Sequence, residues 1–463
     1  MAYEDFIWFD VKGQYTSPVA SVIVYREGDY AVAKVWNEQY GRWSRIAKST
    51  DHASVIQTAI DNAEQHGIIV LHGEFTIDKS ITISKALTIY GGKLIRDTSV
   101  GSSAHNFFTV GGGVGESIIN GPAIVRGVYF DGNERNITST YTEAAGAPVH
   151  TGITIRKIDK VIIENCTFVD MAREAIWIKT VENTSGVIDH EEIIIKNNYF
   201  ENVAYGITAE SYKKVVVVGN IVKGINSNGD PSANRSYFFS PNYLDCIETV
   251  ISNNVIDGEV PSGYPYAGSY GRSAVNFGGG LTIENIVISK NTMKNLQIAI
   301  ENPKKSTIAE NTISDVVIGI SLYVSNDTIV IGNQIRRFTS RGISVTGTST
   351  SYAERNMIIS NIIDTEDQTA DYGIYVWSYV YYNVVAGNIV KGNYNSSDVA
   401  VWSDYNLCDA IQLSSTAFNN LSTNISDFPY KYPLVPMIYY DGAYYYLAVA
   451  DPANKALRKV QLS

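Results

Sequence analysis

The stretch that decides the fold is IIIKNNYF at residues 193–200, followed by GITA at residues 206–209. An apolar strand runs into a polar residue, Asn198, and after one spacer an apolar residue follows. The same arrangement returns in IAENTI at residues 308–313, followed by GISL at residues 319–322. Alternating apolar residues bounded by Asn and Gly are typical of short β-strands separated by turns. The chain therefore repeats a unit of two or three short strands.

The polar position of this unit recurs from about residue 150 onward. Neighbouring copies are between 20 and 37 residues apart, and the shortest spacing defines the bare repeat. A repeat of that length has no room for a crossover helix, which excludes a fold of alternating strands and helices. It predicts a parallel β-helix, in which each strand pairs with its copy in the next coil about 4.8 Å away. The polar positions are Asn198, Asn220, Asn254, Asn291, Asn311, Asn333, Asn361 and Asn388.

An asparagine at the same turn of every coil has a structural interpretation. We expect these side-chain amides to stack and to hydrogen-bond to the backbone of neighbouring coils. The inward-facing Ile, Val and Phe side chains then form a narrow apolar core.

The first coil needs a cover, because an open end exposes unpaired backbone groups and core side chains. Residues 50–63 place Val55, Ile56 and Ile60 on one helical face. Thr50 or Asp51 is the expected N-cap. The segment predicts a cap helix over the first coil.

The cap helix and the strand after it resemble a known family. Residues 51–63, and GIIVLHGEF at residues 67–75, resemble the entry of the pectate-lyase-like right-handed parallel β-helix superfamily. That superfamily includes polysaccharide lyases, glycoside hydrolases, epimerases and phage tailspikes. The resemblance covers residues 50–420 and implies an all-β fold, a right-handed parallel β-helix, and a polysaccharide partner.

The flanking segments predict additional β-structure. Residues 1–48 carry a hairpin pattern around residues 26–29, and we expect them to form a β-rich segment before the β-helix of residues 49–425. Residues 426–463 form a third part, with a hairpin turn at residues 441–442. Its tyrosines fall on both strand faces, so one face must be buried, and a homotrimer is the assembly we expect.

Composition excludes several classes of protein. The chain has 463 residues, 45% of them hydrophobic, which supplies a core and excludes disorder. A net charge of −11 argues against nucleic-acid and anionic-membrane partners. No stretch of apolar residues is long enough to insert into a membrane, and the N-terminus shows no signal peptide. We expect an extracellular or virion-surface protein, whose leader either has been removed or is replaced by another route out of the cell. The few Cys and Met would suit a hot habitat.

Candidate site residues come from the outward columns of the second strand. Aligning the repeats gives Trp177, Thr208, Asn276, Glu301, Ser321, Ser344, Tyr375 and Trp402 in one column. The next outward column contains Lys179, Glu210, Tyr323, Thr346, Trp377 and Asp404. Three insertions, at residues 131–151, 223–236 and 257–272, fall just before this strand and would form a wall beside it. Aromatic faces stack on sugar rings, and Arg, Asn and acids bind hydroxyls or uronates, so the column and wall predict a glycan groove.

From this groove we select two sets of residues. The predicted substrate-binding residues are Trp177, Glu210, Tyr237, Tyr266, Tyr270, Arg272 and Asn276. The candidate catalytic acids are Asp245, Asp257 and Glu301. Glu210 and Glu301 are three coils apart, roughly 14 Å, which is too far for a glycosidase pair.

These observations favour a tailspike-like or cell-surface protein that binds polysaccharide, including a virion receptor-binding or depolymerase component. The alternatives are an extracellular polysaccharide lyase or glycoside hydrolase and a purely structural adhesin. The Asp-Asp pair, Gly-His-Gly and Arg-x-Lys segments of polygalacturonase-like members are absent, so enzymatic activity stays open. No cofactor is predicted. The resemblance leaves Ca²⁺ open, because pectate lyases use acidic calcium ligands that cannot be assigned in this chain.

Overall fold

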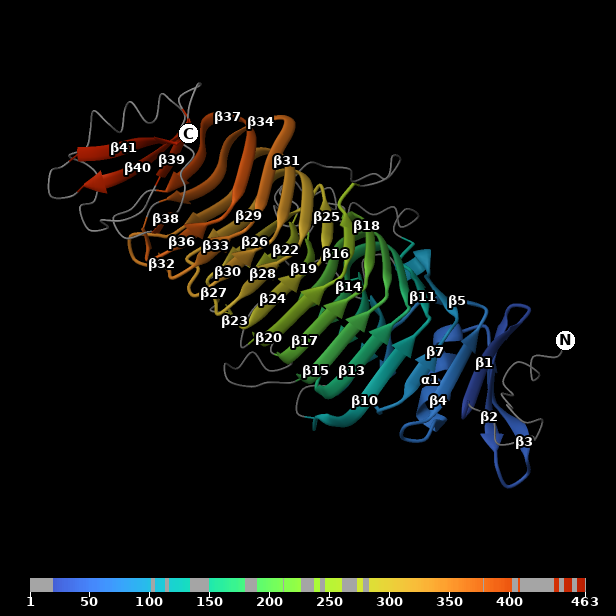
Figure 1. The fold of residues 1–463 in the computed structure, drawn as a ribbon. Helices are drawn as coiled ribbons and strands as arrows, with labels where there is room; N and C mark the ends of the chain where they lie inside the picture. Colours follow the sequence, from blue (N-terminus) through green and yellow to red (C-terminus); the bar gives the residue numbers. More distant parts are fainter. Residues whose placement is uncertain are drawn as a thin grey trace, which may run out of the picture. The chain divides into compact units, whose positions relative to one another are not determined.

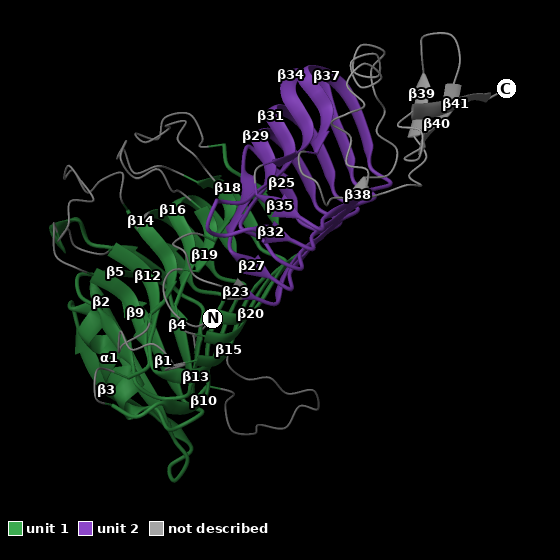
Figure 2. Cartoon of the chain, turned by 90° about the vertical axis from the view of Figure 1, so that its left-hand side faces the viewer, with its two compact units in different colours: residues 1–279 green, residues 280–463 purple. Residues whose placement is uncertain are grey.

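The computed structural model describes most of the chain between residue 20 and residue 462 (Figure 1). The described segments are 20–100, 105–112, 116–133, 150–179, 190–210, 212–225, 237–241, 246–259, 273–277, 283–377, 379–401, 407–408, 437–440, 445–451 and 456–462. They fall into two compact units, unit 1 within residues 1–279 and unit 2 within residues 280–463 (Figure 2).

Unit 1 is built from stacked coils of short strands. Its first sheet contains, in spatial order, β3 (Arg42–Ser49), β2 (Tyr30–Asn37), β1 (Val22–Glu27), β4 (Ile68–His72), β7 (Thr88–Tyr90), β10 (Ile119–Arg126), β13 (Ile158–Glu164), β15 (His190–Lys196), β17 (Tyr212–Val218) and β20 (Cys246–Ser252). The pairs from β1–β4 onward are parallel, whereas β2 is antiparallel to both of its neighbours, β1 and β3. The N-terminal strands β1, β2 and β3 therefore extend the first sheet of the coils and do not form a separate sheet.

The second sheet of unit 1 pairs the remaining strands of each coil in parallel. These strands are β5 (Glu74–Ile77), β6 (Ile81–Ile83), β8 (Lys93–Arg96), β9 (His105–Val110), β11 (Tyr129–Asp131), β12 (His150–Ile155), β14 (Thr167–Ile178), β16 (Tyr199–Ala209), β18 (Ile221–Ile225), β19 (Tyr237–Pro241), β21 (Val255–Asp257) and β22 (Ser273–Phe277). A short 3₁₀ helix spans Thr98–Val100.

Unit 2 repeats the architecture. One set of parallel strands contains β24 (Ile286–Ser289), β28 (Thr307–Ala309), β30 (Ile329–Ile331), β33 (Met357–Ile359), β36 (Val384–Ala386) and β38 (Leu407–Cys408). The other contains β25 (Thr292–Lys294), β26 (Gln297–Glu301), β29 (Thr312–Tyr323), β31 (Gln334–Thr346), β34 (Ile362–Trp377) and β37 (Ile389–Val401). Two parallel pairs, β23 (Ile283–Glu284) with β27 (Pro303–Lys304) and β32 (Ala353–Glu354) with β35 (Val380–Tyr381), complete the coils. An antiparallel sheet of β39 (Met437–Tyr440), β40 (Tyr445–Asp451) and β41 (Ala456–Leu462) ends the described chain.

These parallel coils confirm the predicted fold, a right-handed parallel β-helix with a cap helix and β-rich flanks. The cap helix α1 (His52–Asn62) contacts β2, β3, β5 and β6. Asp51 is its N-cap, and the Asp51 carboxylate accepts a hydrogen bond of 2.9 Å from the backbone N–H of Ser54. The core of unit 1 includes a stack of Phe130, Phe168 and Phe200, whose ring centroids are 4.9 Å and 5.1 Å apart in successive coils.

The predicted asparagine ladder is confirmed within both units. In unit 1, Asn198 Nδ2 donates to Asn220 Oδ1 at 3.0 Å, and Asn220 Nδ2 donates to Asn254 Oδ1 at the same distance. In unit 2 the same bond links Asn291, Asn311, Asn333, Asn361 and Asn388 in turn. Each ladder amide also satisfies backbone groups of neighbouring coils, so the turn contributes hydrogen bonds in the direction of stacking.

The residue before each ladder asparagine turns the corner with a left-handed backbone. Its φ lies between 55° and 67° in every case, although the residue type varies. The corner residues are Asn197, Gly219 and Asn253 in unit 1, and Lys290, Glu310, Gly332, Ser360 and Gly387 in unit 2. Left-handed φ costs a non-glycine residue about 1 kcal/mol or more, so ladder hydrogen bonds must offset that strain.

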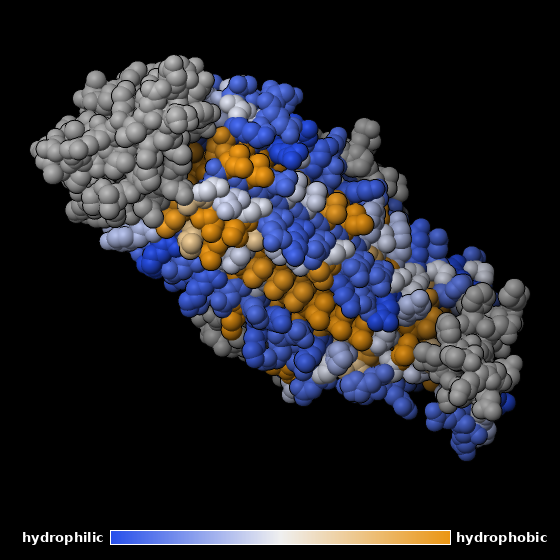
Figure 3. Space-filling model, viewed as in Figure 1, coloured by the Kyte–Doolittle hydropathy of each residue, from blue (hydrophilic) through white to orange (hydrophobic). Residues whose placement is uncertain are grey.

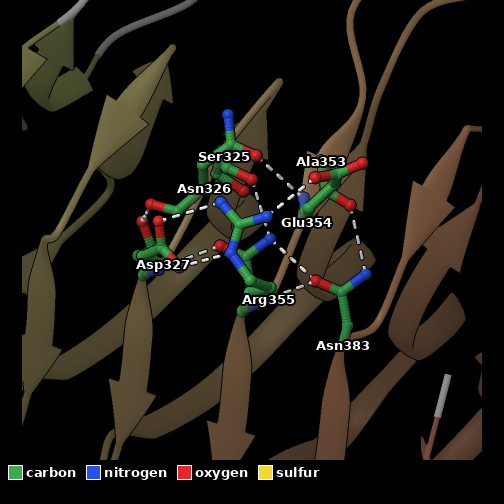
Figure 4. A network of polar contacts seen from close by, with 9 residues as sticks. Ser325, Asn326, Asp327, Ala353, Glu354, Arg355 and Asn383 are labelled. Atoms are coloured by element: carbon green, nitrogen blue, oxygen red, sulfur yellow. Dashed lines mark hydrogen bonds and ion pairs between the residues drawn. The ribbon is translucent and has the colours of Figure 1, made fainter.

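A second ladder, which the sequence analysis did not predict, lies at another corner of unit 2 (Figure 4). Asn356 Nδ2 donates to Asn383 Oδ1 at 2.8 Å and to the carbonyl oxygen of Ser325 at 2.9 Å. Beside it, the Arg355 guanidinium donates to both carboxylate oxygens of Asp327, at 2.7 Å and 3.1 Å. These contacts stabilise the coils and leave Arg355 paired.

The outer face of the first sheet in unit 1 carries a column of half-buried aliphatic side chains. The residues in register are Ile124, Ile162, Ile194, Val216 and Val250. Figure 3 shows apolar surface gathered along this face, bordered by hydrophilic surface. On one border, Glu164 forms ion pairs with Arg126 and with Lys196, the latter at 2.9 Å.

Candidate functional site

The outward column predicted for the second strand exists in unit 1. Register places Thr154 beside Trp177, Trp177 beside Thr208, and Thr208 beside Ser240. Asn276 follows Val275, which pairs with the residue before Ser240, so Asn276 continues the column on β22. The alternate residues Ile153, Ile176, Ile207 and Phe239 are fully buried. Because successive side chains of a strand point to opposite faces, the column is turned away from the core. Thr154, Thr208 and Ser240 in it are nevertheless buried, whereas Trp177 and Asn276 are half-buried.

Trp177 is the centre of a polar and aromatic cluster. Its indole Nε1 donates a hydrogen bond of 3.1 Å to Glu210 Oε1, which belongs to the next coil. The Lys179 ammonium lies over the Trp177 ring, 4.2 Å from the ring centroid. The backbone N–H of Glu210 donates to the Ile178 carbonyl at 2.8 Å, so sheet pairing itself positions the carboxylate beside the indole. Trp177 and Lys179 are half-buried, whereas Glu210 is buried.

The charges around Lys179 tune its basicity. Burial lowers the pKa of Lys179, and the positive charge of Arg156 lowers it further. The carboxylates of Glu210 and Glu174 act in the opposite direction and do not restore the ordinary pKa. Glu174 Oε2 lies 3.5 Å from Arg173 Nε. Cations and two carboxylates therefore surround Lys179, and Lys179 and Glu210 contact the indole ring.

Tyrosine hydroxyls and rings extend the cluster into the following coils. The hydroxyls of Thr208 and Tyr237 are 2.9 Å apart and share a hydrogen bond. The Tyr237 ring packs on Tyr205 with 4.9 Å between ring centroids. Thr208, Tyr205 and Tyr237 are buried, so they support the cluster from below, and the accessible groups are the Trp177 ring and the Lys179 ammonium. An aromatic ring with an ammonium and a carboxylate beside it is a set of groups that recognises the rings and hydroxyls of a saccharide.

The structure brings four predicted site residues together: Trp177, Glu210, Tyr237 and Asn276 all belong to neighbouring coils of unit 1. Asp257 ends β21 in register with Lys223 and accepts a hydrogen bond of 3.0 Å from the N–H of Glu259. That position lies in the column of Glu201 and Lys223, on the earlier part of the strand, and outside the Trp177 column. Glu301 lies in unit 2, where it pairs with Tyr323. Asp245, Tyr266, Tyr270 and Arg272 lie outside the described residues.

Lys179 was placed in the second outward column by strand alternation but was not among the selected substrate-binding residues. Two further charged residues near the cluster, Arg173 and Glu174, were in neither column. Arg173 and Glu174 lie at an irregularity, since the register between β14 and β16 shifts between Met171 and Glu174. A shifted register breaks the two-residue period on which alternation depends, so no sequence signal locates that pair.

The coils and their outward column define the class of protein, a right-handed parallel β-helix. Among solved structures, the chain resembles the A-module of mannuronan C-5 epimerase AlgE6 from Azotobacter vinelandii, at 15% identity and a TM-score of 0.51 over 78% of this chain and 96% of that chain. It also resembles the periplasmic alginate epimerase AlgG, at 14% identity and a TM-score of 0.49 over 74% of this chain and 76% of that one. The Dettilon tailspike protein matches at 13% identity and a TM-score of 0.48, over 86% of this chain and 74% of that one. Similarity at this level of identity establishes the fold alone.

The particular family follows from the sequence of the coils. Residues 115–430 match the family model of NosD, described as a periplasmic copper-binding protein, and the chain belongs to this family. A comparison with curated proteins finds no match. Within the described segments, no helix is long and apolar enough to cross a membrane.

The described residues do not fit a copper site. Copper prefers imidazole and sulfur ligands, yet no group of three or more His, Cys, Asp or Glu side chains in these segments could hold a metal ion. His105 and His150 are directly opposite in β9 and β12, but the fully buried Arg96 donates to the carbonyl of His105. Burial, and then the charge of Arg96, lower the pKa of His105 to about 4. A guanidinium in that position would repel a copper ion in the same way.

Proposed function

We propose that this protein binds a polysaccharide along the outward column of unit 1. The observation that carries the proposal is the Trp177 cluster, in which an indole ring, the Lys179 ammonium and the Glu210 carboxylate meet on one outward face. Sugar rings present C–H faces to aromatic rings and hydroxyls to charged groups, so this set matches a saccharide better than a peptide or nucleic acid. Similarly folded proteins whose names refer to mannuronan, alginate and a tailspike are consistent with it.

The test is a glycan array probed with the purified chain and matched variants. Trp177→Ala removes the platform and should weaken binding by about tenfold or more, the usual cost of losing an aromatic anchor. Tyr90→Ala is the control, because Tyr90 is an exposed aromatic residue on β7 of the same unit. Binding that survives Trp177→Ala unchanged, or no binding to any surface polysaccharide, would contradict the proposal.

The charged partners can be tested without removing the ring. Glu210→Gln keeps a hydrogen-bond acceptor for the indole and removes the charge, so it should change which glycans bind. Glu191→Gln serves as the control, since Glu191 is exposed and paired with Lys213 at 2.8 Å away from the column. Equal glycan profiles for the two variants would show that Glu210 has no part in recognition.

We further propose a tailspike-like role, as an extracellular or virion-surface receptor-binding protein that assembles as a homotrimer. The tyrosine-rich sequence of the C-terminal antiparallel sheet and the aliphatic column of unit 1 are the features that support assembly. Light scattering on the intact chain should give a mass three times 50.9 kDa. A monomer over the whole accessible concentration range would contradict the trimer but leave the glycan site unaffected.

A second candidate function is a polysaccharide lyase or hydrolase. It is favoured by one observation, that the carboxylates of Glu174 and Glu210 both act on Lys179, a lysine whose pKa is lowered. A lysine with a lowered pKa and a nearby carboxylate are groups that exchange protons in catalysis. Release of reducing ends, or absorbance from unsaturated uronates, would reveal the activity, and Lys179→Met should abolish it. Turnover equal in Lys179→Met and in the native chain would exclude these residues as the catalytic set.

A further inference from the structure

Unit 2 carries a separate cluster of aromatic side chains on the outward face of β31 and β34. Register pairs Arg341 with Tyr372, Ser344 with Tyr375, and Thr346 with Trp377. The intervening residues, Ile343, Val345, Ile374 and Val376, are fully buried. Strand alternation therefore places Ser344, Tyr375 and Trp377 on the face turned away from the core, where Ser344 and Tyr375 are buried and Trp377 is half-buried.

The aromatic rings of this cluster are stacked along the strand. Tyr375 and Trp377 lie parallel, with 5.3 Å between ring centroids and an interplanar angle of 9°. The Tyr372 ring is 4.6 Å from that of Tyr375. Tyr323 of β29, which pairs with Thr346, adds an exposed ring one coil away, with 39% of its surface accessible. The Tyr375 ring is buried, so the rings that a ligand can reach are those of Tyr323, Tyr372 and Trp377. Accessible aromatic rings on neighbouring coils are suited to binding sugar rings.

Arg341 supplies a positive charge to this cluster. Its guanidinium lies over the Tyr375 ring, 4.0 Å from the centroid, and Nη1 donates to Ser344 Oγ at 3.2 Å. Within the described part of the chain, Arg341 forms no ion pair, and its buried Nε has no hydrogen-bond partner. By contrast, Arg336 and Arg337 on the same strand both pair with acids. A half-buried guanidinium that is fixed by stacking and has no carboxylate partner among the described residues is suited to binding a carboxylate.

We infer that the surface formed by Tyr323, Arg341, Tyr372, Tyr375 and Trp377 binds an acidic saccharide. Arg341 binds the carboxylate of a uronate residue, and the accessible aromatic rings pack against the sugar rings beside it. Glu301 lies on β26 in the register of Tyr323 and Thr346, so it is two coils from β31, roughly 10 Å along the stack, and also five residues along the strand from the position of Arg341. The acidic sugar therefore binds at the β31–β34 end of this surface, away from that carboxylate.

This inference goes beyond the proposed function, because the surface belongs to unit 2 and selects for charge. It uses none of the residues of the Trp177 cluster, so each can fail while the other stands. Substitution at Trp177 tests the first site, and substitution at Arg341 tests the second.

The experiment is calorimetric titration of the intact chain with oligogalacturonate and with oligomannuronate, each compared with its carboxyl-reduced form. Arg341→Gln should weaken binding of an acidic oligosaccharide by roughly tenfold or more, the equivalent of one charge-assisted contact. It should leave the affinity for the carboxyl-reduced oligosaccharide unchanged. Arg336→Gln is the matched control, with the same change of charge on the same strand, and should alter affinity by no more than about twofold.

Two further variants keep the test decisive. Arg341→Lys retains the charge without the planar fork, so it should recover only part of the affinity while preserving the fold. Tyr323→Ala removes an exposed ring, so a loss of binding in this variant would not come from unfolding. It should weaken binding of the acidic and the carboxyl-reduced oligosaccharides equally. If the native chain binds neither acidic oligosaccharide at millimolar concentration, or if Arg341→Gln behaves like Arg336→Gln, the inference is overturned.

Discussion

At the residue scale, the ladder asparagines carry a large share of the stacking hydrogen bonds. Asn311 accepts from the backbone N–H and the side-chain amide of Asn291, at 3.0 Å and 2.9 Å. It donates to Asn333 Oδ1 and to the Ile288 carbonyl, both at 2.9 Å. All of these groups are shielded from water, so none has an alternative partner.

Asn311→Ala should therefore be strongly destabilising. It leaves a buried N–H and a buried carbonyl unsatisfied, and we expect a loss of about 3 kcal/mol in the free energy of unfolding. Asn388→Ala is the comparison, because Asn388 ends the described ladder and is half-buried, so its loss should be smaller. Chemical denaturation of both variants measures the difference. Equal losses at the two positions would show that burial does not determine how much a ladder asparagine contributes to the free energy of unfolding.

Glycine is required at Gly319 and Gly342 because the next coil leaves no room for a Cβ atom. A Cβ on Gly342 would lie 2.5 Å from Ile363 Cγ2 and 2.6 Å from the carbonyl oxygen of Gly373. Gly319 meets the carbonyl oxygen of Gly342 in the same way. The coils approach too closely there for any side chain.

Gly342→Ala is expected to lower the free energy of unfolding by about 1–3 kcal/mol, through overpacking. Gly332→Asn is the matched control. Gly332 is a corner residue with φ of 65°, and its nearest neighbour, Glu310 Cγ, would be 3.7 Å from a new Cβ. Other coils place Asn at that corner, so the control should cost little. Thermal denaturation compares them, and a harmless Gly342→Ala would refute the packing argument.

At the element scale, the cap helix depends on one charged side chain. Asp51 accepts from the backbone and the hydroxyl of Ser54 and forms an ion pair with Lys79. Burial raises its pKa, but the hydrogen bonds from Lys79 and Ser54 outweigh that effect and lower it to about 2. Because the folded pKa lies below the unfolded value near 3.8, the stabilisation is present above pH 4 and is lost as pH falls toward 2.

Asp51→Ala should cost about 1 kcal/mol at neutral pH, the usual value of an N-cap. Below pH 2 the native carboxyl is protonated, and the gap between native and variant should shrink. Asp61→Ala in the same helix is the control, and denaturation midpoints at pH 7 and pH 2 are the measurement. A gap of the same size at both pH values would mean that the charge of Asp51 contributes nothing.

At the scale of the whole molecule, a bound glycan should stabilise the fold by mass action. At a concentration one hundred times the dissociation constant, the gain is about 2.7 kcal/mol. A polysaccharide selected on the array should raise the thermal midpoint of the native chain. It should raise that of the Trp177→Ala variant much less, because a tenfold weaker dissociation constant reduces the gain to about 1.4 kcal/mol. A shift of equal size in both would place the bound glycan elsewhere.

The predictable part of the site follows strand alternation. Trp177, Thr208 and Asn276 were placed in one outward column from the repeats alone, because a regular strand fixes which face each side chain takes. Arg173 and Glu174 were not predicted, because the register shifts between Met171 and Glu174. Tyr375 and Trp377 were in the predicted outward columns, yet the position of Arg341 beside them depends on a register shift between Arg336 and Arg341 that spacing does not reveal.

The sequence by itself determined the coil, the cap helix and the ladder, because each depends on local periodicity and on side chains repeated at one position. Tertiary structure alone decided which charges are paired. Arg336 and Arg341 stand five residues apart on one strand, yet only Arg336 meets an acid. Ion pairs across coils depend on register between strands that are distant along the chain, and that register is fixed only when the coils stack.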